Sequence, residues 1–425
     1  MTKPPRILDL ALILLVTAAL YLWLGQETFY KVDGRQMVLR LAGGYTRHEQ
    51  HLLYLPLLNA FFGLLAPLGL SPYRVALLWS ALGTVAGLAI LWPAWRLLGL
   101  DRRAASGTTL LIASCPAVVF FATVVELHGT FFAFACLATL LALRHAVQPS
   151  WTRAILLGAG IGLAYHAHAT GVLLPALLFP WILVLSRERR APRPPWKESL
   201  REDGPKLLLA AALLALLIAL QPALAGWLGL ATDPARAGQM LFQGTDAYRS
   251  EKSFRFLAGT LWNEWLRPCF PLAVLAVPAL FVAARRPLAL ALHLGLTVYL
   301  AATCWVLGSD VERGAYLLPL VVPAALLCAA SCRRSGWLAL ALAVSLCLSV
   351  LEVRLVDADP RERERWIDGI ETVIGRRSAY LIVGSLEEID ALLIERSDVP
   401  FFSPFDWTLL PPTRSESTLR SSTSS

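Results

Sequence analysis

Residues 25–56, GQETFYKVDGRQMVLRLAGGYTRHEQHLLYLP, form the most polar stretch in the first hundred residues of the chain. This stretch directly follows the first apolar run, 7–25, which is long enough to span a membrane. It leads into the segment 51–70, which contains Pro56 and Pro67 and is only moderately long between them. We therefore predict a polar loop between a membrane-spanning helix and an interfacial or re-entrant helix.

The composition is that of a membrane protein. Of the 425 residues, 56% are hydrophobic and 16% are charged, whereas a soluble domain averages about 25% charged residues. The mean hydropathy is +0.58. Many windows of roughly 20 apolar residues predict transmembrane helices rather than one large water-soluble core. The net charge of +8 comes from short basic clusters between apolar runs, a pattern of topology signals and not of a nucleic-acid-binding surface.

Eleven apolar segments have the character of membrane-spanning helices. Basic residues gather at the ends that face one side, whereas the short turns 126–128, 166–168 and 309–313 on the other side carry one Arg between them. The positive-inside rule then places the N-terminus in the cytoplasm and the C-terminus outside. The predicted spans are residues 7–25, 72–98, 105–125, 129–143, 152–165, 169–185, 207–230, 268–284, 287–307, 315–331 and 336–356.

The composition changes after the last span. Two strand-like runs, 380–384 and 399–402, flank a helical pattern at 386–396 and predict a small α/β unit. The tail is rich in Ser, Thr and Arg, which predicts disorder. The predicted fold is thus a mainly α, polytopic transmembrane helical bundle with a small α/β appendage outside the membrane. The predicted domains are 1–356 for the bundle, 357–410 for the appendage and 411–425 for the tail.

The residues that could carry chemistry gather at the predicted outer ends of the helices, among them Asp33, Glu126, Asp310 and Glu312. A proton or ion pathway would place such groups at several depths of the membrane, whereas a site at one interface suits an enzyme that acts on a lipid-borne substrate. Five of the seven histidines are also predicted to lie at these outer helix ends, namely His48, His51, His128, His166 and His168.

Asp33 is the candidate general base. A carboxylate can take the proton of an acceptor hydroxyl during group transfer, provided that the two lie within hydrogen-bond reach. The alternative is that Asp33 only caps a helix that starts near Gly34. The spacing does not separate these two roles.

A metal site is a further hypothesis. His48 and His51 are three residues apart and would share one face of a helix. Together with Glu126 and His128 they could ligate a divalent metal such as zinc. The spacing is not a recognised zinc signature, and His-rich loops are more often hydrogen-bonded structure, so both interpretations stay open.

The histidines after the fifth span and the acid after the third also have alternatives. His166 and His168 are two residues apart and point different ways on a helix, so at most one of them is expected to face a site. Glu126 lies at a helix end in apolar surroundings, where it could instead serve as the partner of an Arg or a His.

Arg313 and two tryptophans complete the set. Arg313 could hold a phosphate through its forked donors, or it could pair with Glu312 or Asp310. Trp262 and Trp265 could anchor the chain at the membrane interface, and they could also stack on a sugar.

Several of these motifs resemble the polytopic GT-C glycosyltransferases. The resemblance begins with an Asp in a large first outer loop, an interfacial helix with Pro, and the run SPYRVALLWSALGTVAGLAILWPAWRLLG at 71–99. VVELHGTFFAF supplies Glu126 in a short turn after the third helix, and GLAYHAHATGVLLPALL supplies a His-x-Thr at His168 and Thr170. The chain is most similar to the protein O-mannosyltransferase family that modifies plexin-type receptors, and to its bacterial relatives.

The chain also departs from that family. ERGAYLLPLVVP resembles the late Arg-Tyr motif of the superfamily, but two residues separate Arg313 from Tyr316. HEQHLLYLP replaces the His-Pro-Pro-Gly-type run of the family, and the C-terminal repeats of the receptor-modifying members are missing. A protein acceptor is therefore not carried over.

The resemblance implies an inverting hexosyltransferase of the bacterial inner membrane. It would move a sugar, for example mannose, from a polyprenyl-phosphate donor to a hydroxyl of a protein or glycan acceptor on the outer face. No cofactor is implied with certainty, and a divalent metal is the one candidate. The alternatives are a transporter or flippase of lipid-linked sugars, which would line a path at mid-depth with polar residues, and a non-catalytic scaffold.

The resemblance and the residues together suggest roles within such a site. Asp33 would activate the acceptor hydroxyl, Arg313 would stabilise the departing polyprenyl phosphate, and Glu126 would orient His168 or the acceptor. The predicted sets are Asp33, Glu126 and His168 for catalysis, Arg313, His166 and Arg47 for the donor phosphate, Trp262 and Trp265 for the acceptor or interface, and His48, His51 and His128 for a metal.

Overall fold

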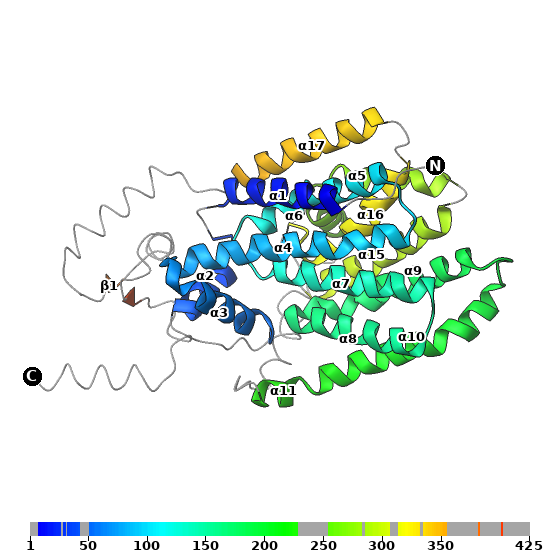
Figure 1. Cartoon of the computed structure of the whole chain (residues 1–425), viewed down its shortest axis with the longest axis horizontal. Helices are drawn as coiled ribbons and strands as arrows, with labels where there is room; N and C mark the ends of the chain where they lie inside the picture. Colours follow the sequence, from blue (N-terminus) through cyan, green and yellow to red (C-terminus); the bar gives the residue numbers. More distant parts are fainter. Residues whose placement is uncertain are drawn as a thin grey trace, which may run out of the picture.

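Long helices, many of them side by side, form a bundle in the computed structural model, and short helices lie at one end of it (Figure 1). The structure describes residues 7–26, 29–30, 32–42, 51–227, 254–282, 285–306, 313–331, 335–354, 381–382 and 401–402. The long helices are α1 (Ile7–Trp23), α4 (Pro72–Leu97), α7 (His128–Val147), α8 (Trp151–Ala167), α9 (Leu174–Arg189), α10 (Trp196–Ala219), α15 (Arg286–Val306), α16 (Leu318–Ser331) and α17 (Ser335–Arg354).

Shorter elements connect and cap this bundle. The short α-helices are α2 (Val32–Ala42), α3 (Tyr54–Leu65), α5 (Arg102–Ala113), α6 (Pro116–Ala122), α11 (Gln221–Trp227), α13 (Phe254–Leu261) and α14 (Leu272–Leu275). Tighter or wider turns form η1 (Ala66–Leu68), η2 (Ala169–Leu173), the π-helical η3 (Trp262–Leu266), η4 (Val277–Phe281) and η5 (Ala315–Leu317).

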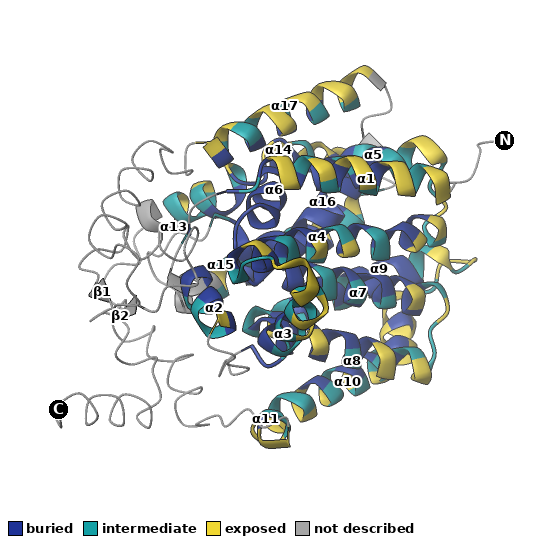
Figure 2. Ribbon diagram, turned by 60° about the vertical axis from the view of Figure 1, so that its left-hand side comes forward, coloured by how far each residue is buried: buried dark blue, intermediate teal, exposed yellow. Residues whose placement is uncertain are grey.

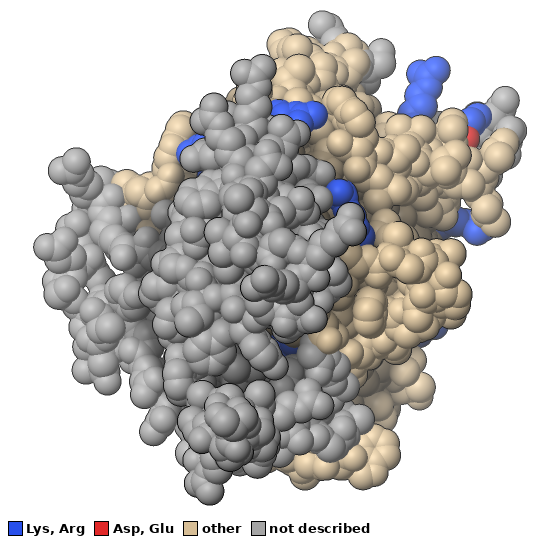
Figure 3. All heavy atoms as spheres, turned by 90° about the vertical axis from the view of Figure 1, so that its left-hand side faces the viewer, with Lys and Arg blue, Asp and Glu red and all other residues tan. Residues whose placement is uncertain are grey.

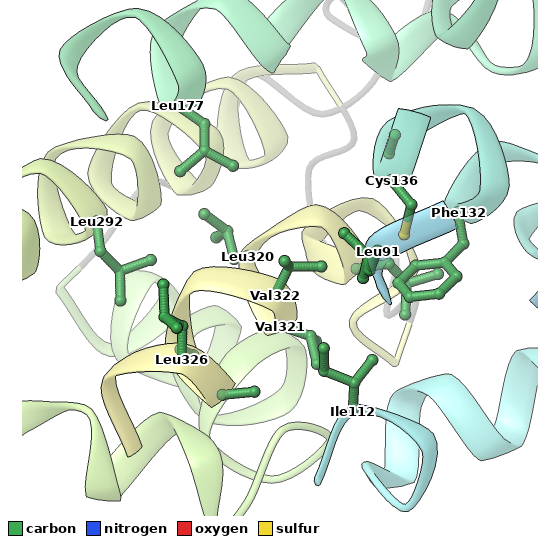
Figure 4. Packing of buried hydrophobic residues seen from close by; sticks show 14 of the residues in the cluster. Leu91, Ile112, Phe132, Cys136, Leu177, Leu292, Leu320, Val321, Val322 and Leu326 are labelled. Atoms are coloured by element: carbon green, nitrogen blue, oxygen red, sulfur yellow. The ribbon is translucent and has the colours of Figure 1, made fainter. Parts of the chain in front are cut away.

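The centre of the bundle is α16. Its sequence LPLVVPAALLCAAS is almost entirely apolar, and residues 318–328 are all buried. A helix that is hydrophobic on every side must be covered on every side. Figure 4 shows how this is done: side chains of α16 lie between those of α9 and α15 on one side and those of α4, α5 and α7 on the other. The labelled side chains of α16 are Leu320, Val321, Val322 and Leu326.

The outward faces are apolar as well. Leu8 and Leu15 of α1 are 77% and 69% exposed, and Figure 2 shows exposed residues along the outer sides of α1 and α17. Among the described residues, four helices are long and apolar enough to cross a membrane: α4, α7, α17, and α9 together with η2. Two bent pairs, α5 with α6 at 61° and α10 with α11 at 52°, raise the number to six. Eleven spans therefore remain a prediction.

Prolines account for two differences from the predicted helices. The segment 105–125 breaks between α5 and α6, where Cys115 has extended backbone angles before Pro116. A proline disfavours the helical conformation of the residue before it and lacks an N–H of its own. The described part of the segment 268–284, residues 268–282, is not one continuous helix but contains α14 and the 3₁₀ turn η4, with Pro278 in the first turn of η4.

Two polar segments are more helical than predicted. The loop 25–56 contains α2, and the stretch between the predicted spans 169–185 and 207–230 contains the start of α10 at Trp196. In the C-terminal region the described parts are β1 (Leu381–Ile382) and β2 (Phe401–Phe402), which pair in parallel with Leu381 opposite Phe401. The helix predicted between these strands and the tail lie outside the described residues.

Candidate active site at one end of the bundle

Glu126 lies where α4 and α7 cross. A Cβ built on Gly129 of α7 would lie 2.4 Å from the carbonyl oxygen of Ser80, and one built on Gly83 would lie 2.8 Å from Gly129. Only glycine permits backbones to approach this closely. The close crossing brings the Ser80 hydroxyl to the turn before α7, where it donates to the carbonyl of Glu126 at 3.0 Å and accepts from its N–H at 3.3 Å. The backbone of Glu126 is thus fixed on α4.

The end of α1 fixes the same turn from the other side. The backbone N–H of Gln26 donates to the carbonyl of Thr123 at 2.7 Å, and the Gln26 side-chain amide donates to the Thr123 hydroxyl at 2.9 Å. The Tyr73 hydroxyl of α4 donates to the carbonyl of Gln26. All three side chains are buried, so the turn that carries Glu126 is held by bonds that water does not reach.

Helix α2 packs directly against that turn. A Cβ built on Gly34 would lie 2.2 Å from the carbonyl oxygen of Val125, the residue before Glu126. The first turn of α2 also contains Asp33. Its side chain lies outside what the structure describes, but its backbone is adjacent to a residue in contact with the Glu126 turn. The buried Met37, Val38 and Leu41 hold α2 in the apolar cluster that also contains Val125.

Three histidines from distant segments form one cluster beside Glu126. The rings of His51 and His168 are stacked, with centroids 4.8 Å apart and an interplanar angle of 15°. The His128 ring lies 5.1 Å from that of His168, and its Nδ1 is 3.6 Å from Oε2 of Glu126. The ring of Tyr316 in η5 contacts both His128 and His168 at 5.9 and 5.4 Å. We call Glu126 and the three histidines the imidazole cluster, and all four are buried.

The orientation of His168 is set by the turn that follows it. His168 ends α8 and caps η2, and its Nδ1 accepts a hydrogen bond from the N–H of Thr170 at 3.2 Å. The Thr170 hydroxyl is 2.7 Å from the same nitrogen. Because Nδ1 accepts from the backbone, the neutral ring carries its proton on Nε2. The His-x-Thr sequence therefore fixes both the position and the tautomer of this imidazole.

Burial keeps two members of this region uncharged. Burial, the neighbouring His128 and Arg40 together lower the pKa of His51 to about 3, although a hydrogen bond with the Ala167 backbone acts in the opposite direction. Burial and the Glu126 carboxylate raise the pKa of Tyr54, the first residue of α3. Loss of solvation disfavours the charged form of either group. Both side chains can therefore donate or accept hydrogen bonds in their neutral forms at neutral pH.

A second polar group lies next to this cluster. Nη1 of Arg313 donates to Oε2 of Glu352 in α17 at 2.6 Å, and Arg267 donates to the other carboxylate oxygen. Arg313 has a φ of 48° and is followed by Gly314 with a φ of 80°. The N–H of Gly314 donates to Oε2 of Glu264 at 3.0 Å, which holds this left-handed turn. The structure thus gives Arg313 a carboxylate partner that differs from the predicted Glu312 and Asp310, which lie outside the described residues.

The structure brings together four of the predicted residues and separates others. Glu126, His128, His168 and His51 meet in the imidazole cluster. The ring of His166 instead packs against that of Tyr165 at 5.3 Å. Arg47 and His48 lie outside the described residues, so their predicted roles stay predictions.

The two tryptophans separate as well. Trp262 is 58% exposed, whereas Trp265 is 3% exposed and belongs to the apolar core. The interface role expected for Trp265 is therefore corrected, because the π-helical turn η3 directs this side chain inward. Trp262 retains the exposure that an interface residue needs.

The described residues include no group of three or more His, Cys, Asp or Glu side chains placed to hold a metal ion. His51 and His128 are present in the cluster, but the third predicted ligand, His48, is not among the residues described.

Sequence analysis did not assign a role to four residues of this region. These four residues are Tyr54, Glu264, Arg267 and Glu352. The sequence around Glu352 indicates a paired carboxylate, because Glu352 is the single acidic residue of α17 and lies in its last turn. An isolated acid at the end of an apolar span is costly without a basic partner.

The fold and the site permit a comparison with known proteins. No family model and no curated protein matches the chain. Among solved structures, it is similar to ArnT from Cupriavidus metallidurans bound to undecaprenyl phosphate, with a TM-score of 0.62 and 15% identity over 95% of this chain and 88% of that one. It is also similar to the apo form of the Archaeoglobus fulgidus oligosaccharyltransferase, with a TM-score of 0.54 and 11% identity over 93% of this chain.

These likenesses show the fold of the chain. The chain shares the fold of ArnT and of the oligosaccharyltransferase, and the GT-C superfamily expected from the sequence stays a prediction. The chain spans 65% of the oligosaccharyltransferase chain, so it corresponds to only part of that protein. The likeness to the O-mannosyltransferase family stays a prediction.

Proposed function

We propose that this protein is a membrane glycosyltransferase that transfers a sugar from a polyprenyl-phosphate donor to an acceptor hydroxyl. The observation that carries the proposal is the structural match over 95% of the chain to an ArnT structure that contains undecaprenyl phosphate. The buried imidazole cluster and the neighbouring Arg313 give the fold a polar site at one end of the helices. That is where a lipid phosphate in one leaflet would present its sugar.

The reaction we propose is a single displacement at the anomeric carbon. The bond between this carbon and the phosphate oxygen breaks, and its electron pair leaves with the polyprenyl phosphate. The acceptor oxygen forms the new bond from the opposite face, and its proton passes to the carboxylate of Asp33. Arg313 stabilises the charge that develops on the departing phosphate. Such a displacement inverts the anomeric configuration, and the partial charge on the sugar makes the transition state oxocarbenium-like.

The imidazole cluster would position the reacting groups. His168 presents an N–H on Nε2, a donor suited to a phosphate or a sugar hydroxyl. Glu126 next to His128 would orient the acceptor or the His128 ring. Mannose is the sugar that we would test first, and the outer face of the bacterial inner membrane is the expected location.

The test is transfer by the purified protein reconstituted in lipid vesicles with a radiolabelled polyprenyl-phosphate mannose. We expect label in a water-soluble acceptor and release of unlabelled polyprenyl phosphate. Asp33→Asn should lower the rate by roughly 10²–10⁴-fold, the range for loss of a general base. Asp9→Asn is the matched control, because Asp9 pairs with Arg102 at the surface of α1, and this variant should keep the wild-type rate.

Two outcomes would contradict the proposal. If Asp33→Asn inserts normally and transfers sugar at the wild-type rate, Asp33 is not the base. If the wild type moves the labelled lipid across the bilayer while its sugar–phosphate bond stays intact, the protein is a flippase and not a transferase.

A further inference from the structure

Glu352 joins two arginines that come from separate parts of the chain. Its Oε1 accepts hydrogen bonds from Nε and Nη2 of Arg267, at 2.8 and 2.6 Å. Its Oε2 accepts from Nη1 of Arg313 at 2.6 Å. Arg267 follows η3, Arg313 precedes η5, and Glu352 lies in the last turn of α17. One carboxylate therefore engages both guanidinium groups.

These three side chains line a cavity of about 60 Å³. Its wall includes Phe120, and the guanidinium carbon of Arg313 lies 5.1 Å from the centre of the Phe120 ring. Tyr316, three residues after Arg313, contacts the rings of His128 and His168. The cavity is thus a neighbour of the imidazole cluster. Its remaining wall is formed by Pro116, Ala117, Asn263 and Pro268.

The charges of this group do not balance. Two guanidinium groups and one carboxylate leave one positive charge, and seven of the ten N–H donors of the two arginines are not used by Glu352. A sugar phosphodiester carries one negative charge, and the phosphate monoester left after transfer carries about −1.5 to −2 at neutral pH. The charge of two arginines without Glu352 balances that of the phosphate monoester. With Glu352 in place, the remaining single positive charge balances only that of the phosphodiester.

The bridge is also open to exchange. Side-chain exposures are 17% for Glu352, 28% for Arg313 and 47% for Arg267. Ion pairs that water reaches contribute little net stability, so a competing anion can replace the carboxylate. The opposite end of the bundle provides a contrast, because Asp203 there is fully buried against Arg190. Removal of that carboxylate would leave a buried charge, which is far more costly.

We propose that Glu352 is an internal counter-anion that occupies Arg267 and Arg313 and yields them to the phosphate monoester that the lipid carries once its sugar has been transferred. The last turn of α17 then acts as a gate beside the cavity. Glu352 is a positioning residue in this scheme, because it acts through the two arginines. The inference rests on the proposed function, since it assumes a phosphate-bearing lipid.

The first experiment is a titration of the detergent-purified protein with undecaprenyl phosphate, followed by native mass spectrometry. Glu352→Gln keeps the shape of the side chain and removes the competing charge. We expect roughly fivefold tighter binding, the factor that corresponds to one exposed ion pair. Glu202→Gln is the matched control, because it also removes a carboxylate from an arginine, Arg190, at the opposite end. Its affinity should equal that of the wild type.

The sign of the effect decides between a gate and a scaffold. A residue that only holds the arginines in place would, on substitution, weaken the binding of phosphate. Weaker or unchanged binding by Glu352→Gln would therefore overturn the gate. Glu352→Asp keeps the charge, and we expect no gain in affinity from it. If the wild type binds no undecaprenyl phosphate at all, the proposed function fails and the gate fails with it.

A second measurement needs no variant. Hydrogen exchange of the wild type should increase at residues 350–354 when undecaprenyl phosphate is added, because the last turn of α17 loses its tie to two arginines. Unchanged or slower exchange there, in a sample that binds the lipid, would overturn the gate while leaving the proposed function intact.

Discussion

Two of the three imidazoles of the cluster, His168 and His51, have their protonation set by different features. The proton of His168 is placed by the backbone of Thr170, whereas the charge of His51 is decided by burial and by His128. The Thr170 contact and the burial of His51 are independent, so the protonation of each ring can be tested by a separate substitution. The stacked arrangement requires at least one of them to be neutral, because two imidazolium rings at 4.8 Å would repel each other.

The neutral state of His51 predicts a specific dependence of stability on pH. The pKa of this ring is about 3 in the folded protein, against about 6.5 in an unfolded chain. Above pH 6.5 the His51 ring is neutral in both the folded and the unfolded state, so its contribution to the free energy of unfolding is at its maximum. As the pH falls from 6.5 towards 3, only the unfolded state binds the proton, so His51 should lower the free energy of unfolding by about 1.4 kcal/mol per pH unit.

His51→Gln provides the measurement, by thermal unfolding in detergent at several pH values. At pH 8 the two proteins differ only through packing and hydrogen bonds. Between pH 6.5 and 5 the melting temperature of the wild type should fall faster than that of the variant. Parallel curves over that interval would show that the ring is not held neutral by the fold.

The position of α2 depends on a single glycine. Gly34 contacts the Val125 carbonyl so closely that a Cβ would lie 2.2 Å from it. Because the obstacle is backbone, Gly34→Ala must shift α2 away from the turn that carries Glu126. We expect a loss of roughly 1–3 kcal/mol in stability, as for other overpacked sites, and a loss of transfer activity.

Gly63→Ala in α3 is the control for this change. No atom lies within 4 Å of a Cβ built there, and alanine favours a helix over glycine by about 1 kcal/mol. Thermal unfolding should therefore show a stable Gly63→Ala protein with normal transfer. If Gly34→Ala behaves like the control, α2 does not pack against the Glu126 turn.

The elements show how far the sequence determines this fold. Hydropathy located the long helices, because a segment covered by lipid or apolar core must itself be apolar. Helix α2 was expected only as the alternative in which Asp33 caps a helix that starts near Gly34, because its segment is polar overall. Gly34, Met37, Val38 and Leu41 nevertheless have the spacing of one helix face. The break at Pro116 could have been expected from the proline alone. Eleven spans and the α/β appendage remain predictions.

The candidate site was predictable in part. Glu126 and His168 stand in short motifs, so both were found from the sequence. The partners that position them were not, because Ser80 reaches Glu126 and Tyr316 reaches His168 only through tertiary contacts. Such contacts depend on the crossing of helices far apart in the chain, which periodicity does not report.

The whole molecule concentrates its candidate chemistry at one end. Helices α4 and α7 run in the same direction, since Ser80 meets Glu126 and Gly87 meets Phe132 further along. Figure 3 views the end at which α2 and α3 lie, and described basic side chains are visible around its border. The opposite end carries the Arg190–Asp203 pair and the start of α10. A site at one end has a definite side of the membrane once the orientation is known.

Orientation is therefore the prediction on which the substrate leaflet depends. The basic clusters predict that the end with Glu126 faces outside. Leu68→Cys near the start of α4 and Glu198→Cys in α10 place single exposed thiols at the two ends. In intact bacterial cells, a membrane-impermeant thiol reagent should modify Leu68→Cys and leave Glu198→Cys unmodified until the membrane is opened. The wild type is the reference, because four of its cysteines, Cys115, Cys136, Cys269 and Cys328, are buried but Cys347 is exposed. Labelling is therefore scored as the modification that each variant gains over the wild type.

The opposite labelling pattern would have a definite consequence. It would place the imidazole cluster and the Glu352 gate in the cytoplasm, where donors activated by nucleotides are available and a lipid-linked sugar is not required. The need for a polyprenyl-phosphate donor follows from the outer location, because energy-rich nucleotides are absent there and the lipid must carry the activated sugar across. The labelling experiment thus tests the substrate class as well as the topology.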